Sequence, residues 1–377
     1  MMKWIPRLVC AFALLCGSAL QCAAGPFVQE DLRIPLPTPG AGDLEALLVR
    51  PNEPGRHPLA LINHGSPRSS ADRPSMTPLA MLPQALEFAR RGWAAVILMR
   101  RGYGSSGGGW TEDYGSCADP NYIAAGAAAA ADLKAAIAYL ADRPDVDISR
   151  TISIGVSAGG FATVALAADA PGGLVAAINF AGGRGSLKDD EVCREDRLVE
   201  AYRAFGRRAR IPMLWVYAEN DHFFGPKLAQ KFKEAFVGSG GDVDFVTAPP
   251  FGSDGHGLFS PAGIPVWSDF VDTFLKRHDL VLRATPSAPI PMAALAAPKA
   301  LSSNGQKAFE AYLTSAPHKA FAMAPDGAFG WRTGQRTIEE ARAAALKLCL
   351  QNAKTCDVMF VDDAAMAKGP SDGLIGQ

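Results

Sequence analysis

Three residues that could together activate a hydroxyl nucleophile follow apolar segments of the chain, in the order serine, aspartate, histidine. Ser157 lies in TISIGVSAGG, Asp221 in WVYAENDHFFG and His256 in the glycine-rich stretch FGSDGHGLF. A serine hydroxyl is a poor nucleophile alone, so it needs a base to take its proton and an acid to orient that base. These residue types predict acyl-transfer chemistry through a covalent intermediate.

The residues around the serine indicate a very tight turn. Gly155 and Gly159 flank Ser157, an apolar β-branched run precedes it, and the helix-like GFATVALAADA follows. A serine thrust outward at such a turn adopts a strained backbone, and a side chain two places away would collide with a neighbouring element. The G-x-S-x-G pattern in this strand–turn–helix context predicts a nucleophile elbow, with the hydroxyl beside a helix N-terminus.

The candidates for base and acid are few, because the chain has six histidines. His256 follows the strand-like VDFVTAP, and its loop could carry the imidazole over the sheet edge. Asp221 comes directly after another strand-like segment, while Glu219 and Asp254 are competitors for the role of the acid. Because the order Ser157, Asp221, His256 is the one expected of this nucleophile turn, we predict these three as the catalytic set.

An oxyanion site is predicted from the stretch LINHGSP (61–67), where a strand ends in an abrupt turn. The backbone N–H of Ser66 can point outward there, and with the N–H of Ala158 it would give two donors to a developing oxyanion. A metal site of His64 with His222 is disfavoured, since no ligand pair has a useful spacing. We interpret His64 as a hydrogen-bonding residue of the turn, and we expect no metal and no other cofactor.

The segments that must position these residues alternate between strand-like and helix-like patterns. After an opening antiparallel pair, short apolar runs typical of strands buried on both faces occur at 58–65, 94–100, 151–157, 174–183, 212–218 and 243–249. The opening pair lies at 28–37 and 43–51. Helices are predicted at 79–92, 122–144, 229–236 and 266–279. This alternation predicts a three-layer α/β sandwich with a mostly parallel sheet.

Two further motifs follow the third and fourth predicted strands: HGSP at 64–67 and RGYGSSGG at 101–108. With the elbow, they make residues 28–278 resemble the α/β-hydrolase superfamily, and most of all its dienelactone-hydrolase and serine-aminopeptidase-like branches. The resemblance implies a serine hydrolase of the α/β-hydrolase fold. Dienelactone hydrolases proper use a cysteine where this chain has Ser157, so that activity is not implied.

Two segments are the candidates for setting substrate specificity. The long loop 101–122 carries four aromatic residues, and Tyr103 and Trp110 are the predicted contacts to a small acyl substrate. The insertion 183–209 lies where hydrolases of this kind place a cap, and its length predicts one helix rather than a lid domain. The alternative is that both segments are only structural.

Residues 1–24 are predicted to be a secretory signal peptide. A short basic head, an apolar stretch and small residues suited to cleavage after Ala24 have the required layout. The apolar stretch is shorter than the ~20 residues that a membrane anchor needs, and the bulky Gln21 disfavours lipid attachment at Cys22. We expect an exported protein, periplasmic or secreted, with no stable membrane insertion after cleavage.

Export makes disulfides the expected state of the four cysteines that remain. We predict Cys117–Cys193, between the long loop and the short cap, and Cys349–Cys356 in the C-terminal region. The formal net charge of −1 gives no indication of nucleic acid or of an anionic membrane surface as a partner. The 48% hydrophobic content is typical of a globular protein. The sequence does not indicate an oligomeric state.

The composition changes near residue 280. A Pro-, Ala- and Ser-rich linker is predicted at 281–305, after a catalytic domain at 25–280. Residues 306–377 are expected to form a small disulfide-stapled α+β module, with a helix at 337–353 and a strand at 356–363. We expect it to fold alone and to be dispensable for chemistry; the alternative is that it covers the cleft and selects substrates.

Together these features predict an exported serine hydrolase that cleaves a carboxylic ester or a related acyl bond. One rival hypothesis is a peptidase of the serine-aminopeptidase or prolyl-oligopeptidase type. Another is a non-catalytic cell-envelope binding protein on the same fold, against which the complete set of serine, histidine and aspartate argues.

Overall fold

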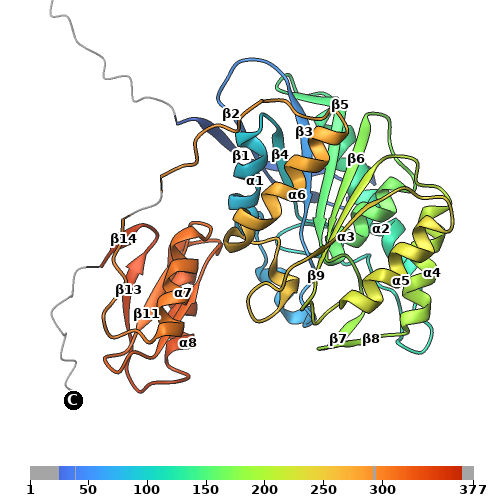
Figure 1. Ribbon diagram of the computed structural model, residues 1–377. Coiled ribbons are helices and arrows are strands. Elements are labelled where there is room, and N and C mark those ends of the chain that lie inside the picture. The colour runs from blue at the N-terminus through green and yellow to red at the C-terminus, as the bar shows by residue number, and fades with distance from the viewer. Residues whose placement is uncertain (1–24, 39, 292–293, 367–377) are drawn as a thin grey trace, which may run out of the picture.

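The computed structural model describes residues 25–38, 40–291 and 294–366, so the predicted signal peptide lies outside the described residues. An eight-stranded sheet forms the centre of the larger domain (Figure 1), in the order β1-β2-β4-β3-β5-β6-β9-β10. Strands β1, β2 and β4 pair antiparallel and the other neighbours pair parallel. The strands are β1 Phe27–Pro35, β2 Asp43–Pro51, β3 His57–Asn63, β4 Ala94–Leu98, β5 Val146–Val156, β6 Leu174–Phe180, β9 Met213–Ala218 and β10 Asp244–Ala248.

Helices cover both faces of this sheet, and a separate apolar cluster fills each side. Helices α1 and α6 contribute to one cluster, and α2, α3, α4 and α5 to the other. The predicted three-layer α/β sandwich is confirmed. The helices are α1 Leu82–Arg90, α2 Tyr122–Leu140, α3 Ala158–Ala167, α4 Glu195–Gly206, α5 Pro226–Val237 and α6 Ile264–Arg277.

Helix α2 is, within the described ranges, the one helix whose length and apolar character would allow it to cross a membrane. It packs against α3, and half of its most apolar stretch of 18 residues is buried inside the molecule. This is the pattern of a core helix in a three-layer fold.

The insertion after β6 contains one helix, α4, as predicted, and also a short hairpin that the sequence did not indicate. The hairpin consists of β7 Ser186–Lys188 and β8 Glu191–Val192. A disulfide joins Cys117 of the long loop to Cys193, which directly follows β8. The long loop and the insertion are therefore covalently linked at the edge of the sheet where the strands end.

The C-terminal module has its own four-stranded antiparallel sheet, in the order β12-β11-β13-β14. Helix α8 packs on one face and α7 on the other, each over a separate apolar cluster. Helix α7 begins at Ser303, inside the stretch predicted as linker, because the Ser302 hydroxyl accepts from Gly305 N–H as an N-cap. Cys349 and Cys356 form a disulfide. The elements are α7 Ser303–Thr314, β11 Ala320–Met323, β12 Phe329–Arg332, α8 Ile338–Cys349, β13 Asp357–Val361 and β14 Ala364–Ala365.

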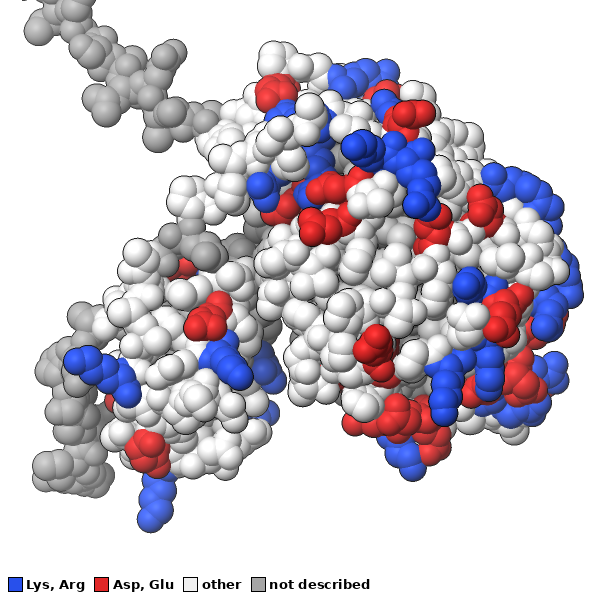
Figure 2. Space-filling model, in the orientation of Figure 1, with Lys and Arg blue, Asp and Glu red and all other residues white. Residues whose placement is uncertain are grey.

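Charged residues of both signs are interspersed over the face shown in Figure 2. Lysine and arginine side chains lie beside aspartate and glutamate side chains on both the larger domain and the module. A broad region of one sign, which would steer a polyanion, is not present on that face.

Candidate active site

The turn between β5 and α3 holds Ser157 in the conformation expected of a nucleophile elbow. Its backbone has φ 56° and ψ −123°, which is strained for a residue with a side chain. A Cβ on Gly155 would lie 2.1 Å from the carbonyl oxygen of Gly159. A Cβ on Gly159 would lie 2.2 Å from the carbonyl oxygen of Asn63 in β3. Both glycines are therefore needed so that the chain can turn and bring Ser157 to the carboxyl edge of the sheet.

His256 and Asp221 form a hydrogen-bonded pair near this edge. The distance from Nδ1 of His256 to Oδ2 of Asp221 is 3.2 Å. An ionised carboxylate can only accept, so the pair places a proton on Nδ1 and leaves Nε2 as the basic nitrogen. The other oxygen of Asp221 accepts from the backbone N–H groups of Phe223 at 2.7 Å and Phe224 at 2.9 Å. These bonds hold the buried carboxylate in one orientation.

The other acids that the sequence offered lie elsewhere. Glu219 is exposed. One carboxylate oxygen of Asp254 accepts from the backbone N–H groups of His256 at 2.9 Å and His222 at 3.1 Å, so it caps the loop and does not meet the imidazole. Among the described residues, Asp221 is thus the acid bonded to the imidazole of His256.

The hydroxyl of Ser157 and the imidazole of His256 line the same cavity. The described residues include no hydrogen bond between these two groups. Hydrogen bonds at catalytic sites without a ligand are often long and shorten when a substrate binds, so the arrangement is compatible with proton transfer. Phe223 stacks on the imidazole with ring centroids 4.0 Å apart, which restricts rotation of the histidine ring.

The predicted oxyanion donors lie beside the serine. Gly65 is so close that a Cβ on it would be 3.2 Å from Cβ of Ser157. Neither the N–H of Ser66 nor that of Ala158 donates to another described residue. Both residues line a cavity that also contains Ser157, so these two N–H groups can receive an anionic oxygen there.

His64 is a neutral residue of the turn. Its Nε2 accepts from the backbone N–H of Arg100 at 3.1 Å, so its Nδ1 carries the proton donated to the Gly65 carbonyl at 2.6 Å. Burial, reinforced by the charge of Arg100, holds the pKa of His64 well below its usual value. Both ring nitrogens are occupied, and the described residues contain no group of three or more His, Cys, Asp or Glu arranged to hold a metal ion.

Tyr103 does not contact the cavities, which corrects the expectation that it binds substrate. Its side chain has no exposed surface, and its hydroxyl donates to Glu112 Oε2 at 3.1 Å and lies 3.0 Å from Ser66 Oγ. Trp110 Nε1 donates to the same hydroxyl at 3.3 Å. Packing of the long loop onto the domain buries Tyr103 against Ser66, so it helps to position the turn that contains Ser66. Trp110, in contrast, lines a cavity.

Two cavities meet at Ser157 and differ in size and lining. The smaller has a volume of about 110 Å³ and includes Ala158. The larger, of about 570 Å³, includes His256. Both are bordered by Ser66, Pro67, Arg68, Ser157 and Phe223. Ser157 is therefore at a boundary between the two cavities, with Ala158 on one side and His256 on the other.

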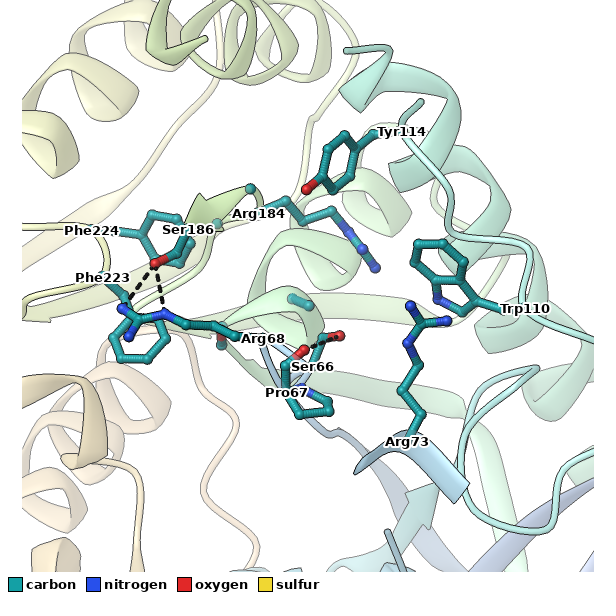
Figure 3. A pocket seen from close by; sticks show the side chains of 14 residues that line it. Ser66, Pro67, Arg68, Arg73, Trp110, Tyr114, Arg184, Ser186, Phe223 and Phe224 are labelled. Atoms are coloured by element: carbon teal, nitrogen blue, oxygen red, sulfur yellow. Dashed lines mark hydrogen bonds between the residues drawn. The ribbon is translucent and has the colours of Figure 1, made fainter. Parts of the chain in front are cut away.

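The smaller cavity is basic (Figure 3). None of its lining residues is acidic, and three are arginines. The guanidinium groups of Arg73 and Arg184 point into it beside Trp110, and that of Arg73 lies 3.6 Å from the centroid of the Trp110 ring. Arg68 lies 3.7 Å from the centroid of the Phe223 ring and donates to Ser186 Oγ.

The positive charge of this cavity is only partly neutralised. Glu112 is buried and accepts from two buried arginines, Arg100 and Arg184, so one carboxylate faces two guanidinium groups. Nε of Arg184 is buried without a hydrogen-bond partner in the described part of the chain. Burial lowers the pKa of Arg184 to about 10, which still leaves it charged at neutral pH. Arg73 makes no ion pair with any described residue. An anion in the cavity would meet unneutralised positive charge.

Sequence reasoning missed these arginines and the residues that hold the histidine. Arg68 directly follows the HGSP motif, which is a local signal. Arg73 lies in a 3₁₀ turn, Ser70–Ser75, and Arg184 follows β6, so only the folded chain brings them together. Three residues of the C-terminal module, Thr333 to Gln335, also line the larger cavity.

Comparisons with known proteins agree with this architecture. The family model for X-Pro dipeptidyl-peptidase (S15 family) matches residues 41–232, just over half of the chain. A puromycin-hydrolysing peptidase of Mycobacterium tuberculosis has 17% identity and a TM-score of 0.51, with 70% of this chain and 41% of that chain covered. No curated protein matches the sequence.

Two further solved structures are similar to about two thirds of the chain. A putative dienelactone hydrolase from Klebsiella pneumoniae subsp. pneumoniae MGH 78578 has 15% identity and a TM-score of 0.47, with 67% of this chain and 100% of that chain covered. The esterase Pf2001 of Pyrococcus furiosus has 16% identity and a TM-score of 0.46, with 67% of this chain and 90% of that chain covered.

Proposed function

The chain belongs to the X-Pro dipeptidyl-peptidase (S15) family, and on that premise we propose that it is an exported serine hydrolase that cleaves a carboxylic ester through an acyl-enzyme. The observation that supports this most directly is the hydrogen-bonded pair of His256 and Asp221 in a cavity that also contains Ser157. A non-catalytic binding protein would have no need for a strained serine, a bonded acid–base pair and free N–H donors together.

The proposed reaction proceeds in two steps. The Ser157 hydroxyl attacks the ester carbonyl as His256 Nε2 takes its proton, and the oxyanion receives hydrogen bonds from the N–H groups of Ser66 and Ala158. The imidazolium returns the proton to the leaving alcohol as the C–O bond breaks. Water, deprotonated by the same imidazole, then attacks the acyl-enzyme and releases the carboxylic acid and the free serine. Asp221 stabilises the imidazolium in both steps.

The positions of base and oxyanion donors assign the two cavities to the two parts of the substrate. The leaving group must lie near His256, which protonates it, and so occupies the larger cavity. The acyl chain then extends into the smaller cavity, which contains Ala158. Since a water molecule occupies about 30 Å³ in the liquid, a volume of about 110 Å³ holds roughly four non-hydrogen atoms of the acyl chain.

Charge then distinguishes between classes of acyl group. A dipeptidyl-peptidase forms an acyl-enzyme that carries a free ammonium group, and the arginine-lined cavity would repel it. An acyl chain that ends in a carboxylate would pair with Arg73 and Arg184. Unit charges ~4 Å apart interact by about 1 kcal/mol in water and about 4 kcal/mol near a protein surface. We therefore propose short, anionic acyl groups as substrates.

A matched pair of esters tests this proposal. The acyl groups of p-nitrophenyl hemisuccinate and p-nitrophenyl methylpentanoate (branched at the terminal carbon) have the same shape and differ in charge. After subtraction of the spontaneous rates, we expect kcat/KM to be at least about tenfold higher for the hemisuccinate, from the interaction energies above. Arg73→Gln should remove most of this preference and leave the rate for the neutral ester near that of the wild type. An equal rate for both esters in the wild type would contradict the anionic assignment.

The peptidase alternative keeps support from the family match, and an amide panel examines it. Aminoacyl and X-Pro p-nitroanilides carry the ammonium group that the smaller cavity should disfavour. We expect their turnover to be far slower than that of the esters. Faster turnover of an X-Pro anilide than of every ester would make the enzyme a peptidase.

Export is the remaining part of the proposal. The sequence of residues 1–24 supports it, and two disulfides are compatible with an oxidising compartment. N-terminal sequencing of the mature protein should begin at Gly25. A mature chain that retains Met1 would contradict cleavage.

A further inference from the structure

The larger cavity beside Ser157 has a wall that comes from the C-terminal module. Thr333, Gly334 and Gln335, in the turn between β12 and α8, line it together with His256. In the proposed reaction this is the side on which the leaving group departs. The module residues are more than 70 positions away from the catalytic histidine in sequence, yet they border the same cavity.

Polar contacts fasten this turn to the catalytic domain. The hydroxyl of Thr77 donates to the Gly334 carbonyl at 2.6 Å. Arg336 donates to both carboxylate oxygens of Glu45, at 2.7 and 3.0 Å, and to the Met76 carbonyl at 3.1 Å. A bidentate pair of this kind fixes orientation as well as position.

The contact at Gly334 is closer than a side chain would allow. Gly334 has φ +63°, and a Cβ there would lie 2.6 Å from Cα of Ala80, in the 3₁₀ turn Pro78–Met81. Helix α7 of the module also lies against the turn Pro261–Gly263, which follows the loop of His256. The two domains thus meet at two places, and one of them, the turn with Gly334, lines the cavity.

Hydrogen bonds within the module hold the same turn in one conformation. The Thr333 hydroxyl donates to the Ala316 carbonyl at 2.6 Å, and the Gln335 side-chain amide donates to the Thr333 carbonyl at 3.0 Å. His318 Nδ1 lies 3.0 Å from the Gln335 carbonyl and donates to it. The turn therefore presents a fixed surface to the cavity.

We propose that the turn Thr333–Gln335 is a specificity determinant: the module completes the leaving-group side of the cleft and selects bulky, uncharged alcohols. The larger cavity is lined by two histidines and by two other ionisable residues, Arg68 and Asp72, whose charges are opposite. This inference rests on the proposed function, because it assumes that Ser157 cleaves an ester. It favours the alternative that the module forms part of the cleft over the expectation that the module is dispensable for chemistry.

Two esters with the same acyl group test the proposal in the full chain. Phenyl acetate and naphthyl acetate have leaving groups of similar acidity and different size, and kcat/KM reports the acylation step in which the leaving group departs. Gln335→Trp narrows the cavity and should lower kcat/KM for naphthyl acetate relative to phenyl acetate by about tenfold or more, as pocket-size changes do. Arg336→Ala releases the turn and should shift the same ratio by at least about threefold.

A matched control is Arg332→Ala, an exposed residue of β12 in the same module whose side chain bonds only to the adjacent Trp331 carbonyl among the described residues. In this variant the ratio of kcat/KM for naphthyl acetate to that for phenyl acetate should equal the wild-type ratio. An unchanged ratio in Gln335→Trp and Arg336→Ala overturns the inference; if the tryptophan variant does not fold, an unchanged ratio in Arg336→Ala alone does so. A wild type inactive on every ester would contradict the proposed function instead.

Discussion

Replacement of Asp221 by asparagine changes the proposed chemistry while it preserves the surrounding structure. One oxygen of Asp221 accepts the N–H groups of Phe223 and Phe224, and an asparagine Oδ1 can keep both bonds. The asparagine NH₂ then faces Nδ1 of His256, where the carboxylate now accepts at 3.2 Å. A donor at that position forces Nδ1 to accept and moves the imidazole proton to Nε2.

The wrong tautomer cannot take the proton of the Ser157 hydroxyl. In a serine–histidine–aspartate triad this substitution costs about 10⁴-fold in kcat, which at ~1.36 kcal/mol per factor of ten is about 5.5 kcal/mol of transition-state stabilisation. We expect a loss of this size for Asp221→Asn with p-nitrophenyl acetate. The circular dichroism spectrum should be that of the wild type.

Glu219→Gln is the matched control for this experiment. Glu219 lies two residues earlier in the same loop, but it is exposed and its side chain makes no hydrogen bond or ion pair with a described residue. We expect its kcat to remain within about threefold of the wild type, as is usual for surface substitutions. Activity of Asp221→Asn within tenfold of the wild type, or a larger loss in Glu219→Gln, would show that Asp221 is not the acid.

Three further predictions concern the framework of the site. Gly159→Ala should lower the free energy of unfolding by more than about 3 kcal/mol, because the added Cβ would overlap the backbone of β3. Urea unfolding measures this loss, and a variant as stable as the wild type would contradict the prediction. Replacing Cys117 and Cys193 together by serine should cost about 4 kcal/mol of unfolding free energy in the chain-entropy account of a loop this long. Free thiols at both positions in the unreduced protein would contradict the disulfide. Burial would raise the pKa of Glu45, but hydrogen bonds from Arg336 and Ser105 hold it below the usual 4.5. The module should therefore be fully docked on the catalytic domain above pH 4.5, and docking should weaken as the pH falls through the lowered pKa of Glu45. Small-angle X-ray scattering would show the loss of docking as a larger radius of gyration. Glu45→Gln should remove this pH dependence, and a radius of gyration that stays constant down to pH 3 would contradict the prediction.

The sequence was sufficient to predict the main strands of the larger domain because these strands are buried on both faces. Continuous apolar runs of this kind are bounded by turn residues and are hard to mistake, and β3, β4 and β9 lie within about two residues of their predicted positions. The elbow was predictable for a similar reason. Its five residues are consecutive, and Gly155 is required by a contact with Gly159 four residues later, so the signal is local even though Gly159 also contacts β3.

The lining of the cavities could not be predicted, because it depends on contacts between distant segments. Tyr103 is an aromatic residue in a long loop, and only packing decides that it faces Ser66 from beneath and does not meet the substrate. Arg73 and Arg184 are more than 100 residues apart in sequence. Helix α7 was missed because its first residues continue the Pro-, Ala- and Ser-rich composition of the linker.

The identity of the nucleophile is the central claim, and covalent labelling tests it most directly. A fluorophosphonate reacts with an activated serine and leaves a stable phosphonyl adduct on its oxygen. Mass spectrometry of the wild-type protein should show one adduct, located on the peptide that contains Ser157, with loss of esterase activity in proportion to labelling. Ser157→Ala should remain unlabelled and inactive. An adduct on another residue, or esterase activity retained by Ser157→Ala, would contradict the account.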